Sequence, residues 1–129
     1  MKKLTLIFTL LFSTVMFSSP SYAKWTEVSE SEIGDTYYVD FERIRKHGGY
    51  VYWWDLIDYL KPTKSGMMSS KKYRQGDCKL FRFKYLSFSS HNEPMGRDIG
   101  DSFSPKNPEW EYPHPNSMIE IILKSVCSR

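Results

Sequence analysis

The side chains that most often carry chemistry are scattered along this chain of 129 residues. His47, His91 and His114 are far apart in the sequence, and each stands in a turn-like or proline-rich context. The sequence contains no GxSxG, HExxH, glycine-rich phosphate-loop or EF-hand pattern. Asp55 and Asp58 are three positions apart in an extended run, and an odd spacing places them on opposite faces of a strand. The sequence therefore predicts neither a catalytic site nor a metal site, and we expect a non-enzymatic protein.

Aromatic residues are the unusual feature, since "YVYWWDLIDYL" (50–60) holds two tryptophans and three tyrosines. Alternate side chains of a strand point to opposite faces, so Trp54 and Leu56 share one face and Trp53 lies on the other. Both faces are apolar at their centre, although one helix covers only one of them. We expect Trp54 and Leu56 to lie inside. For Trp53, a covered position and an exposed ligand-binding position both stay open.

The segment 91–115 loses the periodicity of the preceding runs and carries five of the seven prolines. This length is typical of a functional loop or of an ordered strap over the sheet. Aromatic residues are rare in solvated linkers, so we expect Trp110 and Tyr112 to hold the segment against the fold. The predicted candidate binding surface consists of Trp53, Ile57, Tyr59, Trp110 and Tyr112.

Residues 1–23 have the pattern of an export signal. Two lysines precede an apolar run (4–17), and "SYA" (21–23) places small residues where a signal peptidase cleaves. A membrane anchor is less favoured, because the apolar run is shorter than the roughly 20 residues that span a bilayer. No cysteine stands at the cleavage point, as a lipoprotein signal would require. We expect cleavage after Ala23 and export of the mature chain to the periplasm, the medium or the cell surface, with no membrane-spanning part.

The charge of the mature chain, 24–129, is nearly balanced. Loss of 1–23 removes two of the 18 Lys and Arg residues and none of the 15 Asp and Glu residues, which leaves a formal net charge of +1. Acidic and basic residues alternate in the remainder, as they do over 40–46, and no polybasic stripe is left. Nucleic acid is therefore not expected as a partner. The length fits one small domain with little stability to spare.

Cys78 and Cys127 are the two cysteines of the chain. Neither belongs to a CxxC motif or stands in a histidine cluster, which argues against a reactive or metal-binding pair. In an oxidising compartment the default is one disulfide that joins the middle of the chain to its end. With about 50 residues enclosed, the chain-entropy model gives roughly 4 kcal/mol of stabilisation.

Short extended runs separated by Gly-, Pro- and Asp-rich turns predict a meandering antiparallel sheet, in place of alternating βαβ units. The predicted strands are 24–30, 35–41, 50–60, 67–77 and 78–90, with 42–46 ambiguous. The predicted turns are 47–49, 61–66 and Gly76-Asp77.

The most clearly predicted helix is near the end of the chain, at 116–127. Asn116 or Ser117 is the expected N-cap, and Ser117 with Glu120 forms the capping box S-x-x-E. The apolar residues that can share one face are Met118, Ile119, Ile122 and Val126. So short a helix is stable only when docked, and Cys127 places it on the sheet near Cys78.

Eight short motifs occur in order along the mature chain. They are Tyr38-Val39-Asp40, Ile44 with Gly48, "WDLIDY" (54–59), Ser69-Ser70, "DC" (77–78), "EPMG" (93–96), "NPEW" (107–110) and "PNSMIEIILKSVC" (115–127). Together they closely resemble the surface-adhesin protein E family. The resemblance implies an α+β fold, a single curved antiparallel sheet of about six strands with a C-terminal helix fastened to its concave side by a disulfide.

The same resemblance implies a bacterial surface adhesin that binds extracellular-matrix and plasma proteins, and haem binding and dimerisation are reported for the type member. The present chain lacks that member's lipoprotein cysteine. Two hypotheses follow. The first is a non-enzymatic, exported binding module that presents a sheet face or the segment 91–115 to a host or envelope protein, either as a monomer or as a homodimer. The second is an envelope carrier for a small molecule such as haem, with His91 or His114 as iron ligand; no cofactor is otherwise indicated.

Overall fold

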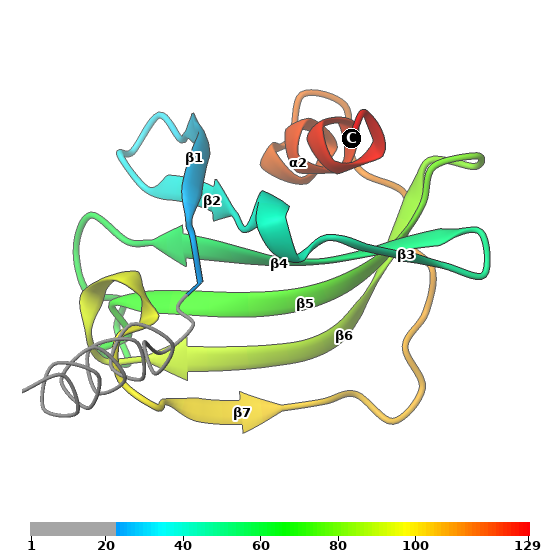
Figure 1. The fold of residues 1–129 in the computed structure, drawn as a ribbon. Helices are drawn as coiled ribbons and strands as arrows, with labels where there is room; N and C mark the ends of the chain where they lie inside the picture. The colour runs from blue at the N-terminus through cyan, green and yellow to red at the C-terminus, as the bar shows by residue number, and fades with distance from the viewer. Residues whose placement is uncertain (1–22) are drawn as a thin grey trace, which may run out of the picture.

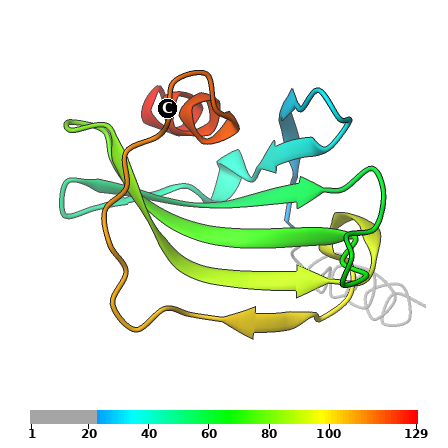
Figure 2. The same ribbon diagram turned by 180° about the vertical axis from the view of Figure 1, so that it is seen from behind.

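The computed structural model describes residues 23–129, in which a curved antiparallel sheet bends around one C-terminal helix (Figure 1, Figure 2). The elements are β1 (Thr26–Glu30), β2 (Thr36–Val39), η1 (Phe41–Arg43), β3 (Arg45–His47), β4 (Tyr50–Asp58), β5 (Ser69–Asp77), β6 (Arg82–His91), η2 (Pro94–Gly96), β7 (Asp101–Phe103) and α2 (Met118–Cys127). The strand order is β1-β2-β4-β5-β6-β7, and β3 pairs with β4 beside this path. The predicted signal segment, 1–23, lies outside the described residues except for Ala23.

The predicted α+β fold with one antiparallel sheet is confirmed. The described sheet has seven strands, where about six were expected. The two that the sequence pattern did not identify are β3 and β7, each three residues long, because three residues are too few to show an alternation. β7 lies within the segment 91–115 and extends the sheet at the edge beyond β6, so this segment is not a strap across the face.

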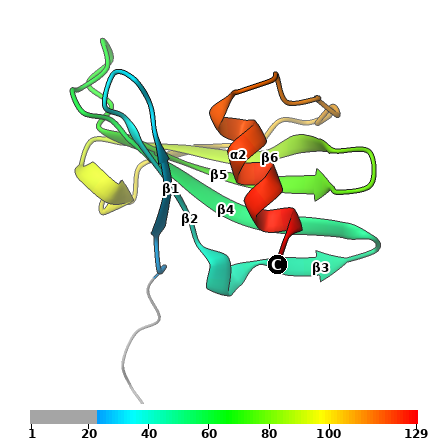
Figure 3. The ribbon, with the colours of Figure 1, turned by 90° about the horizontal axis from the view of Figure 1, so that it is seen from above.

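The core lies between the sheet and α2, which crosses β4, β5 and β6 in the view of Figure 3. We call the face of the sheet toward α2 the inner face and the opposite one the outer face. The buried apolar cluster of the inner face consists of Val39, Val51, Trp53, Phe83, Ile122, Leu123 and Val126. The strands supply alternate residues to it, as the two-residue period of a strand requires.

Of the two tryptophans of β4, Trp53 takes the covered one of its two open positions, and Trp54 is placed opposite to expectation. Trp53 is fully buried beneath α2, and its indole Nε1 donates a hydrogen bond of 2.8 Å to Asp55 Oδ2. Trp54 lies on the outer face and is half-buried. The expectation that Trp54 lies inside is therefore wrong. Alternation shows which residues share a face, but the face that becomes the core is decided by where a helix some 65 residues later docks.

Leu56 is buried as predicted, on the outer face, and 3₁₀ helix η2 covers it. Two hydrogen bonds hold η2 on that face: Met95 N donates to Asp58 Oδ1 at 2.8 Å, and Gly96 N donates to Ser69 Oγ at 2.8 Å. The outer face is thus covered at one end only, the end where β4 stops and β5 begins.

Gly76 lies inside β5, and the predicted turn at Gly76-Asp77 is wrong. A Cβ on Gly76 would lie 2.7 Å from Trp53 Cζ3 and 3.1 Å from Leu123 Cδ1, so the missing side chain allows the tryptophan and the helix to approach the sheet. The strand continues to Asp77, whose Oδ1 accepts hydrogen bonds from the backbone N–H groups of Lys79 and Leu80. The carboxylate of Asp77, and not the glycine, builds the β5–β6 turn.

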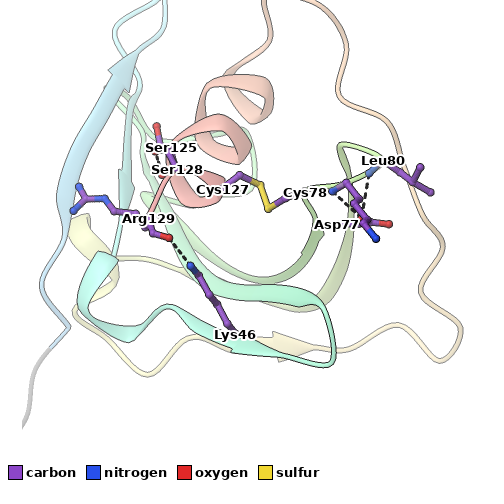
Figure 4. The surroundings of a disulfide bond; sticks show 9 residues. Lys46, Asp77, Cys78, Leu80, Ser125, Cys127, Ser128 and Arg129 are labelled. Atoms are coloured by element: carbon purple, nitrogen blue, oxygen red, sulfur yellow. Dashed lines mark hydrogen bonds between the residues drawn. A yellow bond between two sulfur atoms is a disulfide. The ribbon is translucent and has the colours of Figure 1, made fainter.

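The C-terminal helix begins as predicted. Ser117 is the N-cap, and its Oγ accepts a hydrogen bond of 3.3 Å from Glu120 N. The apolar face differs from the prediction at one position, since Leu123 is fully buried whereas Met118 stays half-buried at the first turn. The predicted disulfide is confirmed: Cys78, just after β5, is bonded to Cys127, the last residue of α2 (Figure 4).

Candidate functional site

The uncovered part of the outer face carries a row of aromatic side chains. We call it the outer aromatic face and define it by Tyr50, Tyr52, Trp54, Tyr73 and Trp110, all half-buried. Alternation along β4 places Tyr50, Tyr52 and Trp54 on this side. Tyr73 of β5 is the register partner of Trp54, and their ring centroids are 4.9 Å apart. The same tyrosine stacks on Tyr52 at 6.3 Å.

The segment after β7 extends this row. Backbone hydrogen bonds between Phe83 and Glu111, of 2.8 and 2.9 Å, fasten the segment to β6. They place the ring of Trp110 5.3 Å from that of Tyr50. The charged groups of Arg82 and Lys84 lie 4.3 and 4.4 Å from the centroid of the Trp110 ring, within the range of a cation–π interaction.

Two hollows flank Trp54 on this face. The smaller, of about 230 Å³, separates it from the start of the described chain and is lined by Ala23, Trp25, Asp40, Arg43, Trp54 and Lys71. The larger, of about 430 Å³, is lined by Glu42, Arg43, Ile44, Arg45, Trp54 and Tyr73. Trp54 therefore forms a ridge between two depressions, and the segment around η1 supplies charges of both signs to their rim.

Such a surface is suited to recognition. Tryptophan, tyrosine and arginine are the residue types that most often dominate binding energy at protein interfaces. On this face Trp54, Tyr73 and Arg43 line the two hollows. Asp55 and Asp58 lie on opposite faces as predicted: the first is bonded to Arg74 on the inner face, and the second accepts from Met95 N on the outer face.

The inner face beside the core holds a buried ion pair. Arg74 is 4 % exposed, and its Nε donates a hydrogen bond of 2.6 Å to Oδ2 of Asp55, which is 1 % exposed. The guanidinium also lies 4.5 Å from the centroid of the Tyr85 ring. Burial, the largest single effect, would lower the pKa of Arg74, but the attraction of Asp55 and Tyr85 and the hydrogen bonds to them together raise that pKa. This pair fixes the position of Trp53, whose indole donates to the same carboxylate oxygen.

Lys72 stands next to this pair on the inner face, with its Nζ 6.0 Å from the Tyr85 ring centroid and 5.9 Å from that of Phe88. Burial, followed by repulsion from Arg74, lowers its pKa from 10.5 to about 8, although Asp55 acts in the opposite direction. At neutral pH the buried Lys72 is therefore charged, and this charge lowers the stability of the folded protein.

Replacing Lys72 by methionine is expected to stabilise the protein at pH 7 by about 1–3 kcal/mol, since each unit of pKa shift corresponds to about 1.4 kcal/mol. Below pH 8 the lysine is charged in the folded and unfolded chains alike, so the cost of burying the charge is complete. Between about pH 8 and 10.5 the folded chain releases the proton first, so the wild type gains stability and the advantage of the variant disappears. Urea denaturation at pH 7, 9 and 10.5 measures this, with the exposed Lys79→Met as control. An advantage that does not change with pH would contradict the burial of a charged Lys72.

The structure separates the five residues predicted as a binding surface. Trp53 and Ile57 are 0 % and 9 % exposed, so their prediction as surface residues is wrong, because α2 and the elements around it cover the inner face. Tyr59 is half-buried at the end of β4, with its hydroxyl 3.3 Å from Ser70 Oγ. Tyr112 is 62 % exposed and does not anchor its segment. Trp110 is the one member that joins the outer aromatic face.

Four residues of the outer aromatic face were not among the predicted candidates: Tyr50, Tyr52, Trp54 and Tyr73. The alternation of side chains over 50–60 already placed Tyr52 and Trp54 on one face, and this pattern could have identified them. Tyr73 joins them only through the β4–β5 register, in which Trp54 pairs with Tyr73.

The two histidines proposed as alternative iron ligands have different surroundings. His91 is 2 % exposed; its Nε2 lies 2.8 Å from Ser89 Oγ and its Nδ1 lies 2.9 Å from the carbonyl oxygen of Asp98. Both ring nitrogens of His91 are engaged, so neither is left to bind iron, and this part of the carrier hypothesis is wrong. His114 is exposed in the segment before α2. Residues 23–129 contain no group of three or more His, Cys, Asp or Glu side chains placed to bind a metal ion.

Comparison with known proteins identifies relatives of this arrangement. The family model for surface-adhesin protein E matches residues 25–128, and no curated protein matches the sequence. The chain is similar to crystal form II of Haemophilus influenzae protein E, with a TM-score of 0.60 and 15 % identity over 84 % of this chain and 91 % of that one. Another structure of Haemophilus influenzae protein E gives 0.59 and 15 % over 84 % and 87 %. The selenomethionine form gives 0.58 and 16 % over 86 % and 92 %. At these identities the structures support the fold alone.

Proposed function

The chain belongs to the surface-adhesin protein E family, and we propose that its outer aromatic face binds a protein of the host or of the cell envelope. Membership makes it an adhesin-like surface protein, which favours a non-enzymatic role and export. In the described part of the chain, no helix has the length and apolar character needed to cross the membrane. The observation that carries the proposal is the Trp54–Tyr73 pair, which stands between two hollows on the face that α2 leaves uncovered.

The shape and composition of the face favour a protein as partner. Pockets for small molecules are concave and enclose most of their ligand, whereas Trp54 lies between two separate hollows that are open to solvent. Protein interfaces combine an aromatic centre with a polar, charged rim. Here Trp54 and Tyr73 supply the centre, and Glu42, Arg43 and Arg45 supply a rim of mixed charge. The aromatic rings are already positioned by cross-strand contacts, which lowers the entropy cost of binding.

Three alternatives have less support. The inner aromatic face, with Trp53 at its centre, is buried. The segment 91–115 contributes the edge strand β7 and the anchored Trp110, and Trp110 itself belongs to the outer aromatic face. The carrier hypothesis loses His91 as a ligand because both of its ring nitrogens are hydrogen-bonded.

Replacing Trp54 by alanine is expected to weaken binding about 30-fold or more, the effect of removing an interface residue that contributes about 2 kcal/mol. Surface plasmon resonance of the mature protein against fibronectin, laminin and collagen IV measures the affinity, and Tyr73→Ala should act in the same direction. Tyr112→Ala is the matched control, because it removes an exposed ring outside the outer aromatic face.

Thermal melting of each variant separates loss of binding from loss of fold. Failure of the wild type to bind any of the three matrix proteins would count against the adhesin function. Binding that survives Trp54→Ala and Tyr73→Ala in folded variants would place the contact elsewhere.

A further inference from the structure

Asp40 is a buried carboxylate without a hydrogen bond. It is 1 % exposed, and neither Oδ1 nor Oδ2 has a hydrogen-bond partner among the residues that the structure describes. Arg43 forms an ion pair with this carboxylate, but the Nε–Oδ2 distance of 3.5 Å is longer than a normal hydrogen bond. A buried carboxylate costs free energy unless it is both paired and hydrogen-bonded. Asp40 therefore has a charged neighbour but still lacks a hydrogen-bond donor among residues 23–129.

The backbone fixes where this carboxylate points. Asp40 N donates a hydrogen bond of 3.2 Å to Trp54 O, and Asp40 follows the inner-face residue Val39, so its side chain lies on the outer side. There it lines the hollow of about 230 Å³ whose other walls include Ala23, Trp25 and Trp54. The buried carboxylate and the beginning of the described chain thus share one hollow.

The register of the edge strand explains why the beginning of the chain lies there. Thr26 of β1 pairs with Val39 of β2, so an antiparallel continuation brings Trp25 alongside Asp40. Directly opposite residues in such a pair have Cα atoms about 4.5–5.5 Å apart. The side chain of Lys24 is also held in this region, with its Nζ 3.3 Å from Glu42 Oε1. The backbone nitrogen of Lys24 is one residue before the position that faces Asp40.

We propose that Asp40 is the binding site for the α-ammonium group of the mature chain, which cleavage between Ala23 and Lys24 creates. Hydrolysis of that peptide bond consumes one water molecule, leaves a carboxylate on Ala23 and turns the neutral amide nitrogen of Lys24 into an ammonium group. The departure of Ala23 also vacates the part of the hollow that it lines. The new ammonium group then donates to the carboxylate that residues 23–129 leave without a hydrogen bond. The inference rests on the predicted cleavage site and not on the identity of the binding partner.

The other cationic groups around the hollow leave the carboxylate without a hydrogen-bond donor. Arg43 is ion-paired with Asp40, but its Nε stays at 3.5 Å and its side chain is 44 % exposed. Lys71 lines the hollow from β5, but its side chain lies against η2, where a Cβ added to Gly96 would be 3.2 Å from Lys71 Nζ. The ammonium of the Lys24 side chain is paired with Glu42. Binding an α-ammonium group, by contrast, costs no side-chain conformational entropy, because the group belongs to the backbone that leads into β1.

The test compares the mature chain, which begins at Lys24, with a chain that retains residues 20–23. At pH 6 the mature chain is expected to melt about 4 °C or more above the extended chain. The α-ammonium paired with Asp40 should have a pKa above its ordinary value of about 8. The advantage should therefore be complete below pH 8 and be lost as the pH rises through the higher, folded-state pKa. Glu42→Gln, which removes the neighbouring carboxylate, should leave the advantage of the mature chain in place.

Asp40→Asn should abolish the difference between mature and extended chains. If this variant does not fold, acetylation of the α-amino group of the wild-type mature chain gives the same information, since it removes the charge without changing Asp40; it should lower the melting temperature to that of the extended chain. Equal melting temperatures of the mature and extended wild-type chains at pH 6 would overturn the proposal, and so would a difference that persists in Asp40→Asn. No binding partner enters these measurements, so their outcome is independent of the adhesin function.

Discussion

Asp55→Ala is expected to lower the free energy of unfolding by about 3–5 kcal/mol, the cost of leaving one member of a buried ion pair without its partner. Arg74 is 4 % exposed and bonded to Asp55 through two contacts, Nε–Oδ2 at 2.6 Å and Nη2–Oδ1 at 3.4 Å. The variant would also remove the acceptor of the Trp53 indole. Urea denaturation at pH 7, followed by tryptophan fluorescence, measures the loss.

A double variant separates the charge from the packing of the side chains. Asp55→Leu with Arg74→Met replaces both charges by apolar groups, and such replacements are often neutral or stabilising. We expect it to recover most of the stability that Asp55→Ala loses. A single variant within 1 kcal/mol of the wild type would show that water reaches Arg74 and that the inner face is not closed.

Removing the disulfide is expected to cost about 4 kcal/mol, because the bond closes a loop with a sequence separation of 49. The loss should appear first in α2. The helix is ten residues long and too short to be stable without docking, whereas β4, β5 and β6 hold one another by long backbone ladders, interrupted only by a bulge between Tyr73 and Arg74. A hollow of about 420 Å³, lined by both cysteines, His47 and Val126, leaves the bond accessible to a reductant.

Hydrogen exchange of oxidised and reduced protein tests this order of events. Amides of Ile122, Leu123 and Val126 should lose protection on reduction at a temperature where those of β4 and β5 keep it. The double variant Cys78→Ser with Cys127→Ser should behave as the reduced wild type and be insensitive to reductant. Identical melting of the oxidised and reduced proteins would show that the bond does not fasten the helix.

Local patterns were sufficient to predict most of the fold. The capping box at Ser117 and Glu120 marked the helix start, since both residues act within one turn. The alternation over 50–60 gave the central strand and sorted its residues correctly into two faces. The single pair of cysteines in a chain with an export signal gave the disulfide.

The features that the sequence did not reveal depend on three-dimensional contacts that periodicity and residue type do not specify. Trp53 and Trp54 are equally aromatic, and only the docking of α2 makes the first a core residue and the second a surface residue. Gly76 resembles a turn glycine, but its role is to leave space for Trp53 and Leu123. His91 resembles an available ligand in a loop, whereas Ser89 and Asp98 occupy both of its nitrogens. The first two relations join distant segments, whereas the partners of His91 are only two and seven residues away, and the fold after β6 brings the second of them to its ring.

The claim that the outer aromatic face is the binding surface is tested most directly by hydroxyl-radical footprinting of the mature protein with and without a matrix protein that binds it in the plasmon-resonance panel. Side-chain oxidation reports on each tryptophan and tyrosine separately. The structure predicts that Trp54 and Tyr73 lose reactivity in the complex, that Trp53 is unreactive in both states, and that Tyr112 stays reactive. Protection confined to Phe103 and Tyr112, with Trp54 as reactive as in the free protein, would contradict it and would assign binding to the segment 91–115.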